Sequence, residues 1–421
     1  MTQELPCRWG MPLLFGLAIA GYPLISFLPV VLGIDSRAVS VPYRAFVVIA
    51  SSVLFYRCGL ATGRFYRGLF WLPLSIFWGL YFFRLFLDTA LVPAGLRLHP
   101  SEYLMFAVGV SFLPMLPFFI HTSARTRQRA LALTLAMAGT AVSLGLSTAL
   151  LSLLSGDTSV LERGRLAIAT LNPISFGHLG ASMVLLAAAA LLSARTNTFR
   201  GSLALLSVVG LGLGVTVLSG SRGPLLALFV GLAVLFLSAL RRDMQLRVVV
   251  VGVVLLVGGF YGGTIIQERL GFGVLTRFQE SGAQLTGQSS LERLQLMRDT
   301  WQQVLEHPLV GSGLEERNSH SYPHNVVLES FMATGVLGGS MFVTLLIMSV
   351  IATWSVVRRQ RQSAWIAALY SQYLIGAQVS GSLYGSSAMW IVMASIVTIA
   401  SSGGSPGRHP DAADPDPQES K

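Results

Sequence analysis

Charged residues are scarce in this chain. Asp, Glu, Lys and Arg make up 11% of its 421 residues, whereas about a quarter of the residues in soluble domains are charged. Acidic residues number 19 and basic residues 29, and no basic run is interleaved with aromatic residues. These absences exclude a soluble domain of ordinary size and a nucleic-acid-binding face.

Long apolar runs dominate instead. Hydrophobic residues make up 53% of the chain, and about twelve runs are long enough to cross roughly 30 Å of hydrocarbon. They cover residues 11–33, 41–56, 68–90, 101–121, 130–154, 172–193, 202–218, 224–240, 248–267, 325–357, 364–381 and 384–401. The sequence therefore predicts an all-α integral membrane protein with about twelve transmembrane helices.

Arginines predict how the chain is oriented. They gather in alternate connections, and positive residues remain on the cytoplasmic side, so both termini are predicted to be cytoplasmic. These residues are Arg57, Arg64, Arg67, Arg125, Arg127, Arg129, Arg195, Arg200, Arg241, Arg242, Arg247, Arg358, Arg359 and Arg361. The two cysteines, Cys7 and Cys58, would both lie on this side, so no disulfide framework is expected.

The predicted spans divide the chain into four parts. Residues 1–267 form a transmembrane bundle of about nine helices, and residues 268–324 form a long loop on the outer side. Residues 325–401 form transmembrane helices ten to twelve, and residues 402–421 form a cytoplasmic tail that should be disordered. Within the loop, residues 289–308 are predicted to form an amphipathic helix lying on the membrane or on the bundle. Its apolar stripe consists of Leu291, Leu294, Met297, Trp301, Val304 and Leu305.

Arg222 is the first candidate functional residue, because an arginine at the bilayer centre costs about 2.5 to 3.5 kcal/mol. It lies in a tight Gly/Ser turn, residues 219–223, between two apolar runs. The small residues would let backbone N–H groups face an anion beside the guanidinium group. The alternative is a turn whose arginine extends to lipid head groups, and the sequence does not separate the two.

Four further arginines lie on the predicted outer side. Arg293 and Arg298 lie off the apolar stripe of the loop helix, and Arg163 and Arg165 precede the sixth apolar run. The planar guanidinium group suits the binding of phosphate through paired hydrogen bonds. Any one of these side chains could instead only solvate its segment.

His320 and His324 lie four residues apart in a loop rich in Gly, Ser and Asn. That spacing would suit zinc if the segment were helical, but Pro323 argues against a helix and no aspartate accompanies the pair. His324 directly precedes a long apolar helix, whose dipole disfavours the imidazolium form. A neutral imidazole can accept a proton; the alternative is a histidine that caps or packs.

Other residues bear on packing and on metal dependence. Gly335 and Gly339 form a GxxxG pair that would let helices pack closely, and Asp88 could pair with Arg84 one turn away or line a pathway. Asp35 is the only acid in the first outer connection, so a metal-dependent glycosyltransferase is disfavoured. Several arginines and one candidate base suit an anionic lipid-linked substrate, without a metal or cofactor.

Three motifs resemble those of bacterial O-antigen ligases. His324-Asn325, nine residues and then Gly335-Val-Leu-Gly338 resemble the family's H[NSQ]-x9-GxxG signature. Arg222-Gly-Pro-Leu-Leu226 looks like its RxxxL motif. Arg293, ahead of a helix that ends in HPLVGSG, resembles a pattern of the wider ligase and polymerase superfamily.

The resemblance implies a GT-C-like glycosyltransferase of lipopolysaccharide biosynthesis in the Gram-negative inner membrane. Such an O-antigen ligase transfers O-antigen polysaccharide from undecaprenyl diphosphate to a lipid A–core sugar hydroxyl on the periplasmic face. The superfamily also contains O-antigen polymerases and enzymes that glycosylate proteins from the same donor. The non-enzyme alternative is a flippase or transporter of lipid-linked glycans, which should line a central cavity with charges from many spans.

Residue chemistry and resemblance together assign expected roles. His324 accepts the proton of the acceptor hydroxyl, while Arg222 and Arg293 stabilise the charge that grows on the leaving diphosphate. A single direct displacement would invert the anomeric configuration. The residues expected to contact substrate are Arg163, Arg165, His320, Asn325 and Arg298.

Overall fold

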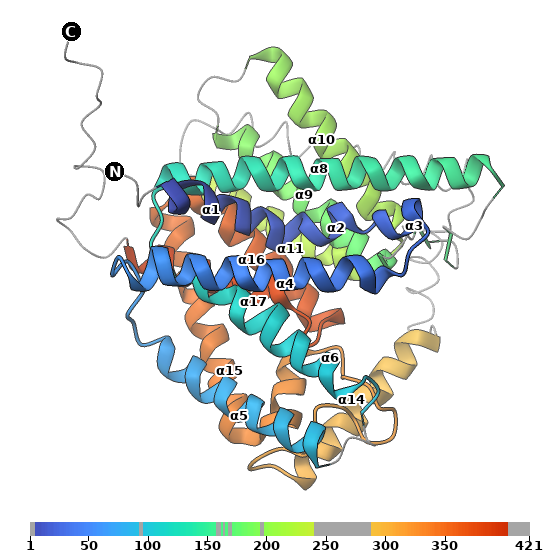
Figure 1. Ribbon diagram of the computed structural model, residues 1–421, viewed down its shortest axis with the longest axis vertical. Helices are drawn as coiled ribbons and strands as arrows, with labels where there is room; N and C mark the ends of the chain where they lie inside the picture. Colours follow the sequence, from blue (N-terminus) through green and yellow to red (C-terminus); the bar gives the residue numbers. More distant parts are fainter. Residues whose placement is uncertain are drawn as a thin grey trace.

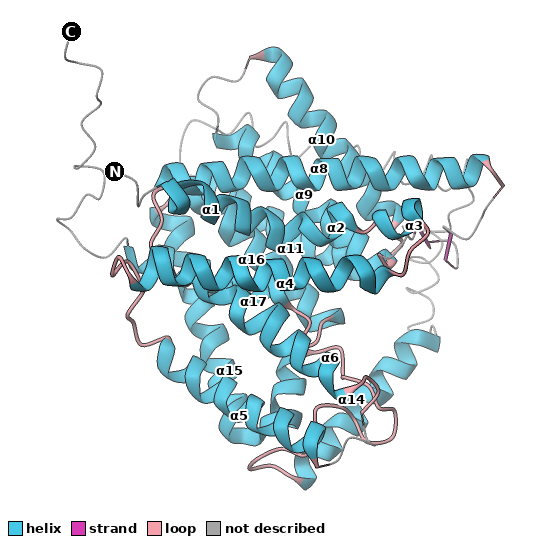
Figure 2. Cartoon of the chain, in the orientation of Figure 1, coloured by secondary structure: helices cyan, strands magenta, loops and turns pink. Residues whose placement is uncertain are grey.

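The computed structural model describes residues 5–91, 96–156, 161–162, 165–166, 171–193, 198–239 and 288–402. Most of these residues are helical (Figure 2), as expected where lipid offers backbone groups no water to bond. A short hairpin, in which β1 (Leu161–Glu162) pairs antiparallel with β2 (Arg165–Leu166), is the sheet within the described residues. The predicted span 248–267 and residues 403–421 of the predicted tail lie outside the described residues.

Three of the membrane-length segments are built from consecutive helical pieces. The pieces are α1 (Leu5–Gly16), η1 (Leu17–Gly21), α2 (Tyr22–Ile25), α3 (Leu28–Leu32), α4 (Ser36–Leu54), η2 (Phe55–Leu60), α6 (Pro100–Leu104), η4 (Met105–Phe112), α7 (Leu113–Met115) and η5 (Leu116–Phe119). Prolines occupy the first or second positions of α2, α3, α6, α7 and η5. Proline lacks the backbone N–H that would continue the helical hydrogen-bond pattern, so it interrupts a helix, and these prolines coincide with the changes from one helical piece to the next.

Longer helices make up the rest of the described chain. They are α5 (Trp71–Ala90), α8 (Ala124–Leu154), α9 (Pro173–Ser193), α10 (Phe199–Leu218), α11 (Arg222–Ala239), α14 (Gln288–Glu306), α15 (Val326–Arg359), the short η6 (Arg361–Ser363), α16 (Ala364–Ser380) and α17 (Ser387–Ser402). Within the described residues, 8 helical stretches are long and apolar enough to cross a membrane. They coincide with predicted runs, and α5, α16 and α17 fill three more predicted runs without meeting that standard of length and hydropathy.

α9 and α16 form the centre of the bundle. α9 contacts α8, α10, α11 and α16, and α16 also contacts α15 and α17. Close approach depends on small residues: a Cβ atom built on Gly180 of α9 would lie 2.7 Å from the carbonyl oxygen of Gly212 in α10. In Figure 1, α8 runs beside α1, and α5 runs along α15 in the lower half of the molecule.

The connections between helices gather at two opposite ends of the bundle. We call one of them the His324 end; its connections are residues 33–35, 96–99, 219–221, 307–325 and 381–386. At this end, Arg37 pairs with Glu102 at 3.1 Å. We call the other the His121 end; its connections are residues 61–70, 120–123 and 360–363. At this end, His121 hydrogen-bonds Ser402 at 2.9 Å.

Cys7 and Cys58 are joined by a disulfide at the His121 end, with their Cα atoms 5.7 Å apart. The prediction of no disulfide is therefore wrong. The two residues are separated by 51 positions in the sequence, and the packing of α1 against η2 brings them together. Spacing along the chain carries no sign of that contact.

Candidate functional site

Arg222 lies where α10 turns into α11. Gly220 adopts a φ of 57°, in the left-handed region that glycine occupies without strain. Arg222 is then the first residue of α11, and its side chain is exposed. A Cβ atom on Gly223 would lie 3.1 Å from Cγ2 of Val379, so this turn packs closely on the end of α16.

Arg293 reaches the same part of α16 from the loop helix α14. Its Nη1 donates to the carbonyl oxygen of Val379 at 3.3 Å, and its side chain remains largely exposed. Arg298 is also exposed, but at five residues further on it lies about 140° around the helix from Arg293. The structure therefore brings Arg293, and not Arg298, to the end of α16.

The apolar stripe predicted for α14 is divided between two environments. Val304 is buried, whereas Leu291, Leu294, Trp301 and Leu305 are exposed. The buried face of the helix instead includes the polar residues Thr300 and Gln303. The helix packs on the bundle through α15 and leaves an apolar face outward, so it has one face for each of the two predicted contacts, with the bundle and with the membrane.

His324 and Asn325 connect the loop to α15. Asn325 caps the helix, because its Oδ1 accepts the Leu328 N–H at 2.9 Å, while its Nδ2 donates to the Gln378 carbonyl at 3.3 Å. His324 has a positive φ of 56°, which is uncommon outside glycine and concentrates at functional sites. Its ring packs edge-on against Tyr322, with centroids 4.5 Å apart.

The last turn of α16 is therefore the point at which the motif segments converge. The Arg222 turn packs on Val379, Arg293 donates to Val379, and Asn325 donates to Gln378. His324 directly precedes Asn325. Three segments that are far apart in the sequence thus meet around residues 378–380.

Gly335 of α15 and Gly311 of the preceding loop allow two backbone segments to approach closely behind this site. α15 is kinked at Gly335, whose φ is 64° and whose Cβ position would lie 2.3 Å from the backbone of Leu309. Gly311, with a φ of 71°, approaches the backbone of Met332 as closely as 2.5 Å by the same construction. Gly335 thus lets the 308–313 loop pack against the helix, which corrects the prediction of a GxxxG helix–helix contact with Gly339.

Arg84 holds this loop and the kinked helix together. Its guanidinium group pairs with Asp88 at 3.3 Å, which confirms the predicted pair one turn apart. It also donates at 2.8 to 3.4 Å to the carbonyl oxygens of Val310, Gly311, Ser312 and Ala333. Asp88 in turn accepts the Leu314 N–H at 2.7 Å, so both residues support the loop rather than line a pathway.

Glu315 belongs to this region and was missed in the sequence analysis. Glu315 is 5% exposed; its carboxylate accepts the Tyr103 hydroxyl and, at 2.9 Å, the Arg97 backbone N–H. Burial raises the pKa of the Glu315 carboxyl, although those two hydrogen bonds oppose the rise. The one available signal was two adjacent acids, Glu315 and Glu316, in a chain that has few.

Charge and burial set the protonation of His324. Burial lowers the pKa of its imidazole below the usual 6.5, and the positive charges of Arg293 and Arg97 lower it further, while the Ser380 backbone opposes the change. Its buried Nδ1 has no hydrogen-bond partner among the described residues. The ring is therefore neutral near pH 7 and able to accept a proton.

A cavity of about 630 Å³ opens beside this site. Tyr322 and Ser380 line its border with the motif residues, and it continues between the helices toward His178 and Met389. Arg44 also lines it, with its guanidinium group 4.6 Å from the centre of the Phe106 ring. Its volume falls in the range of small-molecule binding sites.

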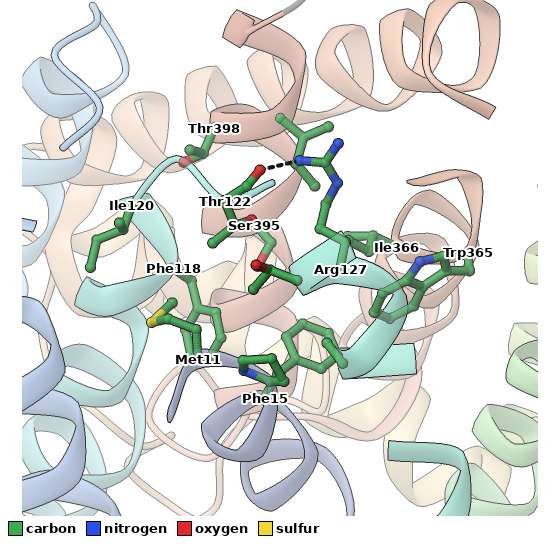
Figure 3. A pocket seen from close by; sticks show the side chains of 14 residues that line it. Met11, Phe15, Phe118, Ile120, Thr122, Arg127, Trp365, Ile366, Ser395 and Thr398 are labelled. Carbon is green, nitrogen blue, oxygen red and sulfur yellow. Dashed lines mark hydrogen bonds between the residues drawn. The ribbon is translucent and has the colours of Figure 1, made fainter. Parts of the chain in front are cut away.

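A second cavity lies at the His121 end and differs in kind (Figure 3). Its volume is about 40 Å³, and most of its lining residues are apolar, including Met11, Phe15 and Trp365. Arg127 points its guanidinium group to the Thr122 carbonyl. Since Trp365 and Ser380 lie at opposite ends of α16, this cavity is about 20 Å from the motif residues along that helix.

The remaining predicted site residues are placed only in part. Arg163 lies outside the described residues, and for Arg165 the backbone of β2 is described but not the side chain. His320 is exposed, has a φ of 48°, and donates its backbone N–H to the Glu316 carbonyl at 2.9 Å. Residues 317–325 contain no helix, so His320 and His324 share no helical face. No cluster of three or more His, Cys, Asp or Glu suited to a metal occurs in the described part of the chain.

Comparison with known proteins agrees with the geometry. Residues 207–343 match a family model described as O-antigen ligase. The matched segment includes the Arg222 turn, α14, the 308–325 loop and the kink of α15. No curated protein matched the chain. The match over residues 207–343 supports membership of this membrane protein in the O-antigen ligase superfamily.

Proposed function

We propose that this protein is an O-antigen ligase of the bacterial inner membrane. It transfers polysaccharide from undecaprenyl diphosphate to a sugar hydroxyl of lipid A–core, at a site on the periplasmic face. The observation that carries this proposal is the convergence of the Arg222 turn, Arg293 and His324 on the end of α16.

In this mechanism His324 is the general base. It removes the proton of the acceptor hydroxyl as the oxygen bonds to the anomeric carbon of the donor. The bond between that carbon and the diphosphate breaks, and the diphosphate leaves with the electron pair. One displacement at the anomeric carbon gives inversion, and the lowered pKa of His324 keeps the base in its neutral, proton-accepting form.

Arg222 and Arg293 bind the departing diphosphate. Both side chains are exposed at the end of the bundle, and both belong to segments in contact with Val379. Guanidinium groups placed where charge develops stabilise a transition state in the way that a metal ion does in other enzymes. Asn325 fixes the start of α15 beside them and so sets the position of His324.

The test is transfer by purified protein in EDTA. The protein is incubated with undecaprenyl-diphosphate-linked glycan, with and without lipid A–core, and the products are separated on a gel. We expect glycan to appear on lipid A–core. Loss of transfer that added divalent metal restores would reject the assignment of phosphate binding to the two arginines.

Two other outcomes would change the functional class. Lengthened lipid-linked glycan without use of lipid A–core would identify a polymerase that uses the same donor. No covalent product with either mixture would favour a transporter of lipid-linked glycan, for which transport into vesicles is the direct measurement.

A further inference from the structure

The inner end of the 630 Å³ cavity carries a histidine that the proposed mechanism does not use. His178 lies five residues into α9, about 7.5 Å along the helix from Pro173, and it lines the cavity. Its ring lies against Gly376 of α16, where a Cβ atom would come within 2.7 Å of Cε1. Position 376 of α16 therefore has room for glycine only while the His178 imidazole lies beside it.

The Nδ1 atom of His178 is not available to a ligand. Its Nδ1 is buried and has no hydrogen-bond partner within the described residues. A neutral imidazole carries its proton on one nitrogen only, and a buried donor without an acceptor is rarer than a buried acceptor without a donor. We therefore assign the proton to Nε2, which makes the ring a hydrogen-bond donor to whatever occupies the cavity.

Tyr322 and Phe106 line the cavity, and the buried ring of Tyr384 lies between them. Tyr322 packs on His324, the Tyr322 and Tyr384 rings are 6.1 Å apart, and Tyr384 is 6.0 Å from Phe106. Arg44 lies over the Phe106 ring at 4.6 Å. Aromatic rings and a few polar donors suit a ligand with both apolar and polar faces.

We propose that this cavity is a saccharide subsite. The sugar end of one substrate stacks on the aromatic wall, and a sugar oxygen accepts a hydrogen bond from His178 Nε2. An isoprenoid chain fits these observations less well, because hydrocarbon would leave the imidazole donor unsatisfied at a cost. The inference rests on the proposed function and names which part of a substrate enters the cavity.

The experiment measures binding, so that it does not depend on transfer. His178→Leu removes the donor, and His178→Gln places an amide N–H near the position of Nε2. Each variant in lipid nanodiscs is titrated with undecaprenyl diphosphate alone, with the glycan-linked donor, and with lipid A–core. We expect His178→Leu to weaken binding of one saccharide-bearing ligand about tenfold, the loss of one hydrogen bond, and His178→Gln to recover most of it.

The pattern across ligands decides the inference. Weaker binding of the glycan-linked donor alone assigns the cavity to the donor sugar, and weaker binding of lipid A–core alone assigns it to the acceptor. Equal changes for undecaprenyl diphosphate with and without glycan, or no change for any ligand, would overturn the proposal. Phe106→Leu, which removes a ring of the aromatic wall, provides a second variant if His178→Leu does not fold.

Failure of this inference differs from failure of the proposed function. If wild-type protein transfers glycan while the His178 variants bind every ligand normally, the ligase assignment stands and the saccharide subsite is rejected. If wild-type protein gives no transfer but saccharide binding depends on His178, the subsite stands and the reaction is rejected.

Discussion

The two ends of the bundle both carry arginines that donate to backbone carbonyls, yet they differ in their backbone conformations and in their cavities. At the His324 end, Arg84 and Arg293 donate to backbone carbonyls of loop and helix ends, two histidines have positive φ, and a large cavity opens between helices. At the His121 end, the cavity is small and mainly apolar, and a disulfide joins two helices. The candidate functional residues therefore lie where the backbone is irregular and held by side-chain hydrogen bonds, and the number of arginines at an end does not mark the site.

The largest expected effect comes from exchanging one histidine at each end. His324→Ala should reduce transfer by about 100- to 10,000-fold, the range for loss of a general base, while donor binding is kept. His121→Ala, at the other end, should transfer at the wild-type rate. The measurement is the initial rate of glycan transfer to lipid A–core, with donor binding titrated in parallel.

A His324→Ala variant with near-normal rate would remove the general base from the mechanism. In that case the imidazole would neither accept the proton nor be needed to position the acceptor, and the comparison between the two ends would no longer depend on a proton acceptor.

Arginine exchanges should give the next largest effect. Arg222→Lys and Arg293→Lys keep the charge but lose the planar fork, so each should lower transfer about 10- to 100-fold if one charge-assisted hydrogen bond is lost. Arg125→Lys, an exposed residue of the His121 end, is the matched control. Rates at saturating and at limiting donor concentration separate weaker donor binding from a slower chemical step. Equal rates in all three variants would show that a positive charge without the planar guanidinium group is sufficient for transfer.

Glycine exchanges test the packing behind the site. Gly335→Ala places a Cβ atom against the Leu309 backbone and requires a φ of 64°, so it should lower the free energy of unfolding by at least about 1 to 3 kcal/mol. Gly210→Ala meets no atom within 4 Å in α10 and should be neutral or slightly stabilising. Thermal unfolding in detergent compares the two, and equal melting temperatures would mean that the kink relaxes without cost.

The sequence predicted most of the fold because membrane insertion leaves a direct signal. Apolar runs had to be helices, and the structure has helices at every predicted run that falls within the described residues. It predicted the α14 helix and the Arg84–Asp88 pair for the same local reason, since both depend on spacing along one helix.

What the sequence did not predict depends on contacts between distant segments. The Cys7–Cys58 bond needs two helices to pack, and the role of Gly335 needs a loop 25 residues earlier to lie against it. The same limit explains why Glu315, Arg97, Arg44 and His178 were missed. Motif order identified Arg222, Arg293 and His324, but only the folded chain shows that their segments meet on the end of α16.

A smaller effect is expected on the pH profile. His324 must be neutral to accept a proton, so transfer should fall as pH drops through its pKa, and the acid limb of kcat/KM should lie below pH 6.5 because that pKa is lowered. The positive charge of Arg293 contributes to the lowering, so Arg293→Gln should move the limb to higher pH. An unmoved limb would show that Arg293 does not act on His324 through charge.

The smallest effect on transfer, and the sharpest test of orientation, comes from the disulfide at the His121 end. Cys7→Ser should leave the rate nearly unchanged, because the bond lies near the opposite end of the bundle from His324.

If the His121 end faces the cytoplasm, as its arginines predict, cellular reductants should keep both thiols reduced. Alkylation of acid-quenched cells followed by mass spectrometry should then find Cys7 and Cys58 alkylated, because the bond seen in the structure would be kept reduced in the cell and would form by oxidation in air after purification. A disulfide already present in the quenched cells would place this end on the oxidising side, and His324 would then face the cytoplasm, where the proposed periplasmic ligase reaction could not occur.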